Sequence, residues 1–407
     1  MLFTFVSAIL AQDGSIYSRY GLGELSSAYS ARRAGFGGLG IALADNQNLS
    51  SMNPAAWNGI TMTRFEGGLS TDMWNVSDQT SNAKYSNIRF SGFMIGIPLQ
   101  RDYGLTLVGG MVPFSNVSYD VSHVRTSDVL GVDYTINYVG SGGLSKLFLG
   151  TTYRLPFDWS IGIAYEYYTG HIDYDSRVVF ATGSNYENSN YKQNNLYRGL
   201  GVNLGVISNN IATFFDVKAF NEFRLGFALN KIAALKTDNN SLAISSLGSA
   251  TLDYQLVDTK IPDRISAGAA FRIYDNYTIL LDFVSQDWGK YTFNDEYSSF
   301  LNEYTKYSLG FEYKLRDVQL RTSTLEQIAW RGGLSYESSQ YSINGEDVDG
   351  YSIHAGLSYP LEFGNTIDLA IKYSTRGKTS NNLVEEKLIK MYFSMSIGEF
   401  WFIRQDK

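Results

Sequence analysis

Two glycine-rich stretches are the first candidates for chemistry in this sequence. Gly35-Phe-Gly-Gly-Leu-Gly40 has the spacing of a dinucleotide-binding loop, but no strand precedes it and no βαβ unit follows, so we reject that interpretation. Arg376-Gly-Lys-Thr379 resembles the end of a phosphate-binding loop, but Lys372 stands where its first glycine should be. Neither stretch predicts a nucleotide site.

Titratable side chains are the second candidates. His123, His171 and His354 lie on separate segments without the spacing of a metal site. No nucleophile and base can be paired, so we predict no catalytic residue, no metal, no cofactor and no enzyme activity. Charged residues recur instead on the polar face of predicted strands. We expect them to form ion pairs inside a barrel, with direct contact to a substrate as the alternative: Arg154, Glu166, Arg224, Arg272, Glu312, Arg331 and Asp368.

Composition points to a single large β unit. The chain has 407 residues, 18% of them charged, with 30 Tyr, 24 Phe, 39 Gly and only 6 Pro. Aromatic residues suit strands, and glycine suits turns and crowded barrel interiors. A net charge of −7 argues against a nucleic-acid partner, and the lack of Cys excludes disulfides and thiolate metal sites. No apolar run is long enough for a transmembrane helix.

Strict alternation of apolar and polar residues organises the chain from about residue 61 onward. Trp159, Ile161, Ile163, Tyr165 and Tyr167 share one face of a predicted strand, and small or polar residues occupy the other. The same pattern recurs at 223–230, 367–374 and 389–398. A period of two places the two faces of a sheet in different environments.

The alternation indicates a membrane barrel rather than a soluble sandwich. Its polar face mixes small residues with both signs of charge, as a wet lumen does, and its apolar face suits lipid. Trp159 and Tyr167 are spaced to bracket the apolar band at the two membrane interfaces. The predicted fold class is all-β: a transmembrane antiparallel β-barrel of about 14 strands with a small N-terminal plug inside the lumen.

An even strand count places both chain ends on the periplasmic side, with short turns there and longer loops outside. The short turns include Gln100–Asp102 and Pro156–Phe157. The predicted outside loops are Asn75–Tyr85, Ser115–Val132, Ala181–Asn195, Lys236–Ala250 and Gln340–Asp349. For the second of them the alternative is that the third strand, Tyr103–Phe114, runs on to Val124.

The N-terminal sixty residues lack the alternation. Residues 1–11 are apolar and finish in small residues, which indicates an export signal cleaved before Gln12; a buried strand is the alternative. Residues 12–60 form the N-terminal extension and plug, and residues 61–403 the barrel. Within the extension, Ser30–Ile60 is compact and rich in Gly and Ala, so we expect it to fill the lumen.

The third strand departs from the pattern. Val108-Gly-Gly-Met-Val-Pro113 places Gly109, Gly110 and Pro113 at the depth of the lipid. Glycine permits a bulge and proline cannot donate to the ladder. Two interpretations stand: a bulge at the barrel rim, or a kink that opens a gap in the wall.

The N-terminal layout resembles the FadL-type family of outer-membrane transporters of long-chain fatty acids and hydrocarbons. The resemblance rests on a Gly/Ala-rich segment, an Asp, and then Asn53-Pro54-Ala55 before the first strand. It implies that Asn53, Pro54 and Ala55 form a hatch against the kinked third strand, with Asn53 bonding to the backbone at Gly109 and Gly110. The alternative is a purely structural role, in which Asn53-Pro54 only turns the chain into the first strand.

The resemblance implies a passive channel for fatty acid-like molecules or hydrocarbons, which leave sideways through the wall. Its partners would be membrane lipid, lipopolysaccharide and a small hydrophobic ligand, in the outer membrane of a Gram-negative bacterium. Some barrels that resemble this family instead dock partners in secretion machinery. An outer-membrane protein partner is therefore the alternative, bound through the outside loops or through Gly14–Leu25, a lead that the transporters do not share.

Overall fold

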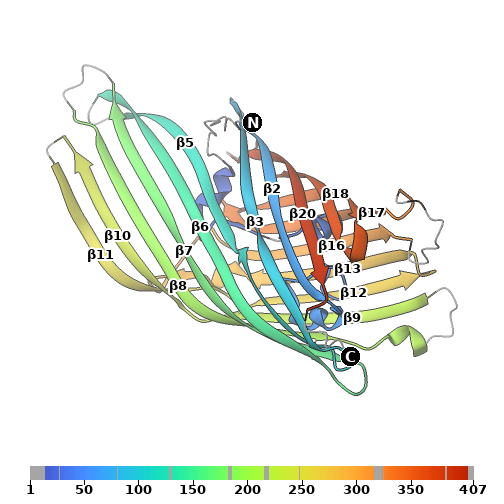
Figure 1. The fold of residues 1–407 in the computed structure, drawn as a ribbon. Helices are drawn as coiled ribbons and strands as arrows, with labels where there is room; N and C mark the ends of the chain where they lie inside the picture. Colours follow the sequence, from blue (N-terminus) through green and yellow to red (C-terminus); the bar gives the residue numbers. More distant parts are fainter. Residues whose placement is uncertain are drawn as a thin grey trace, which may run out of the picture.

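The fold is a closed antiparallel β-barrel of fourteen strands, in a computed structural model. The structure describes residues 14–401 apart from 27, 80, 128–130, 182–185, 215–219, 247, 316–322, 324 and 381–382. Each strand pairs with its neighbours in the chain, and the first strand, β2, pairs with the last, β20, from Thr63↔Glu399 to Ser77↔Glu385. This pairing closes the barrel (Figure 1).

Three of the fourteen strands are broken in two. The third consists of β4 and β5, the seventh of β9 and β10, and the eighth of β11 and β12. The wall strands are β2 (Thr63–Ser77), β3 (Asn82–Gln100), β4 (Leu105–Pro113), β5 (Ser115–Ser127), β6 (Val132–Arg154), β7 (Ser160–Phe180), β8 (Ser189–Ile207), β9 (Phe220–Ile232), β10 (Leu235–Ser245), β11 (Gly248–Lys260), β12 (Arg264–Ile273), β13 (Tyr277–Asp287), β16 (Glu303–Tyr313), β17 (Ala329–Ile343), β18 (Glu346–Pro360), β19 (Thr366–Arg376) and β20 (Glu385–Glu399).

The remaining elements are short and fill the lumen or the connections. They are η1 (Ile16–Arg19), β1 (Glu24–Leu25), α1 (Ala31–Gly35), η2 (Pro54–Gly59), η3 (Ile211–Phe214), η4 (Trp288–Lys290), β14 (Thr292–Phe293), β15 (Glu296–Tyr297) and η5 (Glu362–Gly364). Among the described residues, no helix is long and apolar enough to cross a bilayer.

The outer face of the wall carries a band of exposed apolar side chains. On β7 and the residue before it, Trp159, Ile161, Tyr165 and Tyr167 all point outward, as the alternation predicts. Beyond Tyr167 the same face turns polar, with the side chain of His171 69% exposed. The apolar band therefore ends near Tyr167, and aromatic residues lie at both of its borders.

The wall is much taller on one side than on the other. Strands β6, β7, β8, β10 and β11 continue beyond the level where β13 and β16 end (Figure 1). The far edge of β11 pairs only at its last two residues, Thr259 and Lys260, with β14. The rest of that edge is not paired with any described strand.

Several predicted outside loops are wrong because they are strands. Ser115–Val132 contains β5, Lys236–Ala250 contains most of β10 and the start of β11, and most of Asn75–Tyr85 belongs to β2 and β3. These segments lie above the apolar band, so their outer faces meet water and need not be apolar. On the inner face, Val117 and Tyr119 of β5 and Leu235 of β10 are buried in a cluster inside the lumen.

The predicted position of the chain start is also wrong for the first described residue. Gly14 lies beside Ser118 and Arg89, near the tall end of the barrel, whereas the C-terminal end lies at the short-turn end (Figure 1). The segment 14–26 enters the lumen from the tall end, and the chain then descends through the plug to β2.

The plug, residues 28–60, packs directly against the backbone of the wall at several positions, and each of these wall positions is a glycine. A Cβ on Gly205 would lie 2.0 Å from the side-chain oxygen of Asn53, and one on Gly162 would lie 2.4 Å from the carbonyl carbon of Pro54. Similar contacts below 3.2 Å with plug residues recur on five other strands, at Gly226, Gly268, Gly310, Gly333 and Gly356. These seven positions are the wall glycines.

The facing of the wall predicts a depth-dependent cost for added charge. Leu369 on β19 is 45% exposed in the middle of the apolar band, and Thr375 lies on the same face near the tall end. We expect Leu369→Arg to cost about 2–4 kcal/mol and Thr375→Arg about 0–1 kcal/mol. Heat-modifiable gel mobility in urea measures both, and equal costs would contradict the assigned band.

Candidate functional site: the wall opening and the plug

The barrel wall has an opening between β3 and β5. The ladder between β3 and β4 runs from Gln100↔Leu105 to Phe93↔Met111 and then stops. Beyond that point β5 pairs with β6, while residues 82–92 of β3 pair only with β2. The facing edges of β3 and β5 therefore diverge, as Figure 1 shows. The N-terminal segment covers part of the β5 edge. Glu24 and Leu25 of β1 pair with Asn116 and Ser115, and the Ser18 hydroxyl bonds to the backbone N–H and carbonyl of Ser118.

A bend at Phe114 produces the opening. The Phe114 ring is 5% exposed and meets Tyr168 edge-on at 5.1 Å inside the lumen. Opposite the bend, Gly142 and Gly143 of β6 adopt φ angles of +112° and +145°. Side chains rarely allow these angles, so the two glycines let β6 follow the break between β4 and β5. The Gly-Gly pair inside a predicted strand is the sequence signal for this bulge, and it was missed among the predicted gate residues.

The predicted gate residues on the third strand lie beside the opening. Gly109 and Gly110 pair regularly with Ile95 and Met94 of β3 and with β6. Pro113 is the last residue of β4 and pairs with Ser145. The ladder is thus intact at Gly109 and Gly110. It ends at Met111 on the β3 side and at Pro113 on the β6 side.

The predicted bond between Asn53 and the third strand is wrong. The Asn53 amide donates to the carbonyls of Ile41 at 2.9 Å and Val206 at 3.4 Å, and its side-chain oxygen accepts from the Ala55 N–H at 3.0 Å. Asn53 therefore caps η2 and anchors it to β8. Pro54 and Ala55 pack against β7 and β8 at the wall glycines. Asn53 does not hold the opening, and we abandon a gate built on it.

Buried ion pairs fix the plug to the opposite wall. Arg331 of β17 donates to Glu312 at 2.8 Å and to Asp368 at 3.3 Å. Arg32 of α1 pairs with Asp45 in the plug and lies 3.4 Å from Glu312. All of these side chains are at most 8% exposed. We call them the plug network: Arg32, Asp45, Glu312, Arg331 and Asp368.

The other predicted lumen residues do not join the plug network. Arg154 donates to the carbonyl of Asn58 in the plug at 3.2 Å, and Glu166 pairs with Lys146 of the wall at 2.7 Å. Arg224 and Arg272 both pair with Glu222 at the short-turn end. In the described part of the chain, no group of three or more His, Asp or Glu could hold a metal ion.

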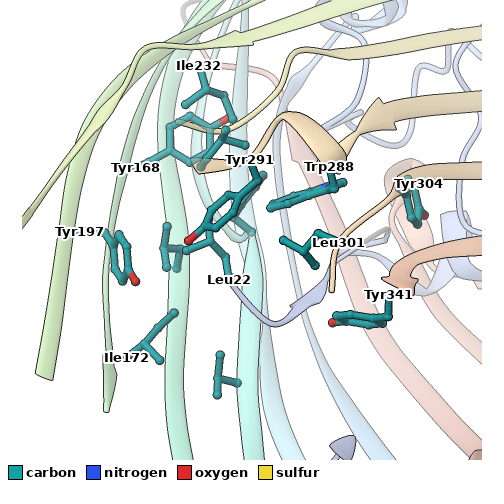
Figure 2. Close-up of a cluster of buried hydrophobic side chains, with 14 of the residues drawn as sticks. Leu22, Tyr168, Ile172, Tyr197, Ile232, Trp288, Tyr291, Leu301, Tyr304 and Tyr341 are labelled. Atoms are coloured by element: carbon teal, nitrogen blue, oxygen red, sulfur yellow. The ribbon is translucent and has the colours of Figure 1, made fainter. Parts of the chain in front are cut away.

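The tall half of the lumen is filled by a cluster of aromatic and aliphatic side chains. Tyr168 and Tyr197 from the wall meet Leu22 from the N-terminal segment, and Trp288 and Tyr291 from the connection after β13 (Figure 2). Arg376 and Glu386 bind the same segment through Ser15. Gly14–Leu25, proposed above as a partner-binding lead, is thus packed inside the barrel.

A cavity of about 370 Å³ lies where the opening meets the plug. Ser26, Ala28 and Tyr29 border it from the N-terminal region, and Phe90 and Ser115 border it from the two edges of the opening. Four cationic side chains also line it: Arg89, Lys146, Arg264 and Lys390. The sequence indicates only which face of its strand each of these four cations occupies. It does not indicate that they share a cavity, because they come from four strands that meet only after the barrel closes.

Barrel, plug and wall opening together define a plugged β-barrel with the fold of FadL-type proteins. The family described as BamG matches residues 1–406, so the chain belongs to the BamG family. No curated protein sequence matches it.

Solved structures confirm the resemblance to FadL-type proteins at the level of the fold. The toluene transporter TbuX of Ralstonia pickettii has a TM-score of 0.61 at 13% identity, over 92% of this chain and 99% of that one. The toluene transporter TodX of P. putida has 0.59 at 14%, over 92% and 100%. A Pseudomonas aeruginosa FadL homologue has 0.58 at 10%, over 92% and 98%.

The plug network should resist moderate acid. Burial opposes the charged form of Asp45, but Arg32, Lys314 and the N–H of Gln47 together hold the pKa of its carboxyl well below the usual value. A pKa lowered by folding contributes stability above the unfolded-state value of about 3.9 and loses that contribution as pH falls further. We expect the protection factors of the α1 amides, which correct for the intrinsic pH dependence of hydrogen exchange, to stay constant from pH 8 to 5 and to fall only below about pH 4.

Asp45→Asn should reproduce the acid state at neutral pH, because Arg32 then keeps only its contact with Glu312. Asp258→Asn is the matched control, since Asp258 forms an exposed pair with Lys236 outside the lumen. Equal exchange in the two variants would show that the ion pair of Asp45 does not hold the plug.

Proposed function

We propose that this protein is an outer-membrane channel that takes up hydrophobic molecules passively and releases them sideways between β3 and β5. The observation that carries the proposal is the wall opening. It begins at the upper border of the apolar band, where Phe90 and Ile88 on β3 are 51% and 62% exposed. The cavity behind it extends from these strand edges to the plug.

The physical case rests on where an apolar solute is stable. Lipopolysaccharide resists apolar solutes, whereas the hydrocarbon below it dissolves them. A protein that brings such a solute past the polar layer and opens sideways needs no energy source. Fatty acid-like molecules and hydrocarbons both fit this scheme, and the structurally similar TbuX and TodX are toluene transporters.

Closing the opening should stop uptake. The guanidinium of Arg89 on β3 lies 3.2 Å from the side-chain oxygen of Asn116 on β5 once that amide is turned to accept. The chain has no Cys, so cysteines at 89 and 116 would be the only thiols. We expect a short bismaleimide across this pair to abolish uptake of labelled toluene and oleate by cells.

The matched control is the same double variant treated with a monofunctional maleimide, which modifies both thiols without joining the strands. Uptake should persist in that control. Equal uptake by the cross-linked and control proteins would rule out exit between β3 and β5.

A second candidate function is a docking subunit of an outer-membrane assembly, and the free edge of β11 favours it. Leu252, Tyr254 and Leu256 alternate along that strand and are 57%, 68% and 63% exposed. Tyr254 and Leu256 lie opposite the polar residues Asn240 and Asp238 on β10. An exposed apolar edge strand accepts a strand from another chain through its unpaired backbone groups.

Photo-cross-linking distinguishes this candidate from the channel. A photoreactive residue at 254 should capture one defined protein in intact cells, and one at Leu281 on the lipid-facing wall should not. Tyr254→Lys should remove the partner, while Asn240→Lys on the adjacent strand should retain it. Loss of the partner in both variants, or its capture from both positions, would contradict docking at the β11 edge.

A further inference from the structure

The cavity behind the wall opening has an unusually cationic lining. Its lining residues include Arg89, Lys146, Arg264 and Lys390, and no Asp or Glu is among them. These cations come from β3, β6, β12 and β20, so they converge on the cavity from different sides of the barrel. A cavity designed only for apolar cargo would not need them, because burying a charge is costly.

Two carboxylates behind the lining neutralise only part of this charge. Asp72 lies 3.3 Å from Arg89 and 3.2 Å from Lys390, and Glu166 lies 2.7 Å from Lys146. Arg264 has no ion pair or hydrogen bond from its side chain to any described residue. Four cations against two carboxylates leave two positive charges uncompensated at the cavity.

Hydroxyl groups add uncharged donors at the mouth. Ser91 on the β3 edge and Ser115 on the β5 edge are 5% and 4% exposed and both line the cavity. Their hydroxyl oxygens make no hydrogen bond with the described part of the protein. Two arginines, two lysines and two such hydroxyls form a donor set suited to an oxyanion with several acceptor oxygens.

The position of the mouth indicates where that oxyanion comes from. Pro113, where the β4 ladder ends, pairs with Ser145, which in turn pairs with Thr169, two residues beyond Tyr167. The opening therefore begins at the border between the apolar band and the polar exterior, which is the level of lipid headgroups. Phe90 beside the mouth faces the membrane, where it can contact acyl chains.

We propose that this cavity binds the phosphate group of a membrane lipid, whose acyl chains remain outside in the bilayer. A phosphate monoester carries about 1.5–2 negative charges near neutral pH, which matches the two uncompensated cations. At about 370 Å³ the cavity is near the lower end of the roughly 300–1,000 Å³ of small-molecule sites, so it admits a headgroup and not a whole lipid. Arg264 is the lining cation without an ion pair or side-chain hydrogen bond to the described residues.

The proposal shares the wall opening with the proposed channel but does not depend on transport. Its test is therefore binding to the purified full-length protein in neutral detergent, measured by native mass spectrometry. The probes are phosphatidic acid, diacylglycerol with the same acyl chains, and inorganic phosphate. We expect phosphatidic acid to bind one to one and at least about tenfold more tightly than either of the other two.

Arg264→Gln should weaken phosphatidic acid binding by roughly ten- to hundredfold, since it removes a charge-assisted contact. Arg198→Gln is the control, because Arg198 lies at a similar level on the outer face of β8 and pairs with Asp238. Heat-modifiable mobility confirms that both variants are folded barrels.

Three outcomes would overturn the proposal. Equal binding of diacylglycerol and phosphatidic acid would mean that the phosphate is not recognised. Equally tight binding of inorganic phosphate would assign the site to a free anion rather than a lipid. An equal loss in Arg198→Gln and Arg264→Gln would place the lipid on the outer face of the barrel. None of these results bears on hydrocarbon uptake, which the cross-linking experiment tests separately.

Discussion

The structure depends on a solution to one electrostatic problem: charged groups face a lumen from which most water is excluded. A buried charge without a partner is strongly destabilising, and a buried pair is tolerated when its geometry is good and its remaining atoms are bonded. Arg331 meets this condition by bonding Glu312, Asp368 and the hydroxyl of Ser358. Arg32 of the plug approaches the same Glu312, so the plug brings a second cation to a wall site that has one arginine and two carboxylates.

The same constraint separates the lumen into regions with different character. Around α1 the ion pairs and wall glycines leave no room between plug and wall. Toward the tall end, tyrosine, tryptophan and leucine side chains fill the space around the N-terminal segment. At the opening between β3 and β5, the cationic lining remains partly uncompensated. The tightly packed regions hold the plug. The remaining cavity is the part of the lumen where positive charges and hydrogen-bond donors remain available for a ligand.

The sequence predicted the fold well wherever one side of a strand met lipid, because the alternation from Trp159 to Tyr167 reports that contrast directly. It missed most of β10 and left β5 open as an extension of the third strand, since the outer faces of those segments meet water and the lipid-facing pattern disappears. It placed Asn53 against the wrong strand for a different reason. Which wall strand a plug residue meets depends on how the chain turns inside the barrel, and no local pattern encodes that path. Glu312, Arg331 and Asp368 were recognised as lumenal, but their convergence on Arg32 appears only when β16, β17 and β19 are assembled around α1.

The wall glycines have a consequence for how this protein can be varied. They trace the outline of one particular plug on the inner surface of the barrel, from Gly162 on β7 to Gly356 on β18. A plug of different shape would meet side chains where this one meets bare backbone, and would leave gaps where glycine is no longer needed. Plug and barrel are therefore not interchangeable modules. If the N-terminal segment of one such barrel is grafted into another, the receiving wall must also be substituted, so that glycines lie wherever the new plug contacts the backbone.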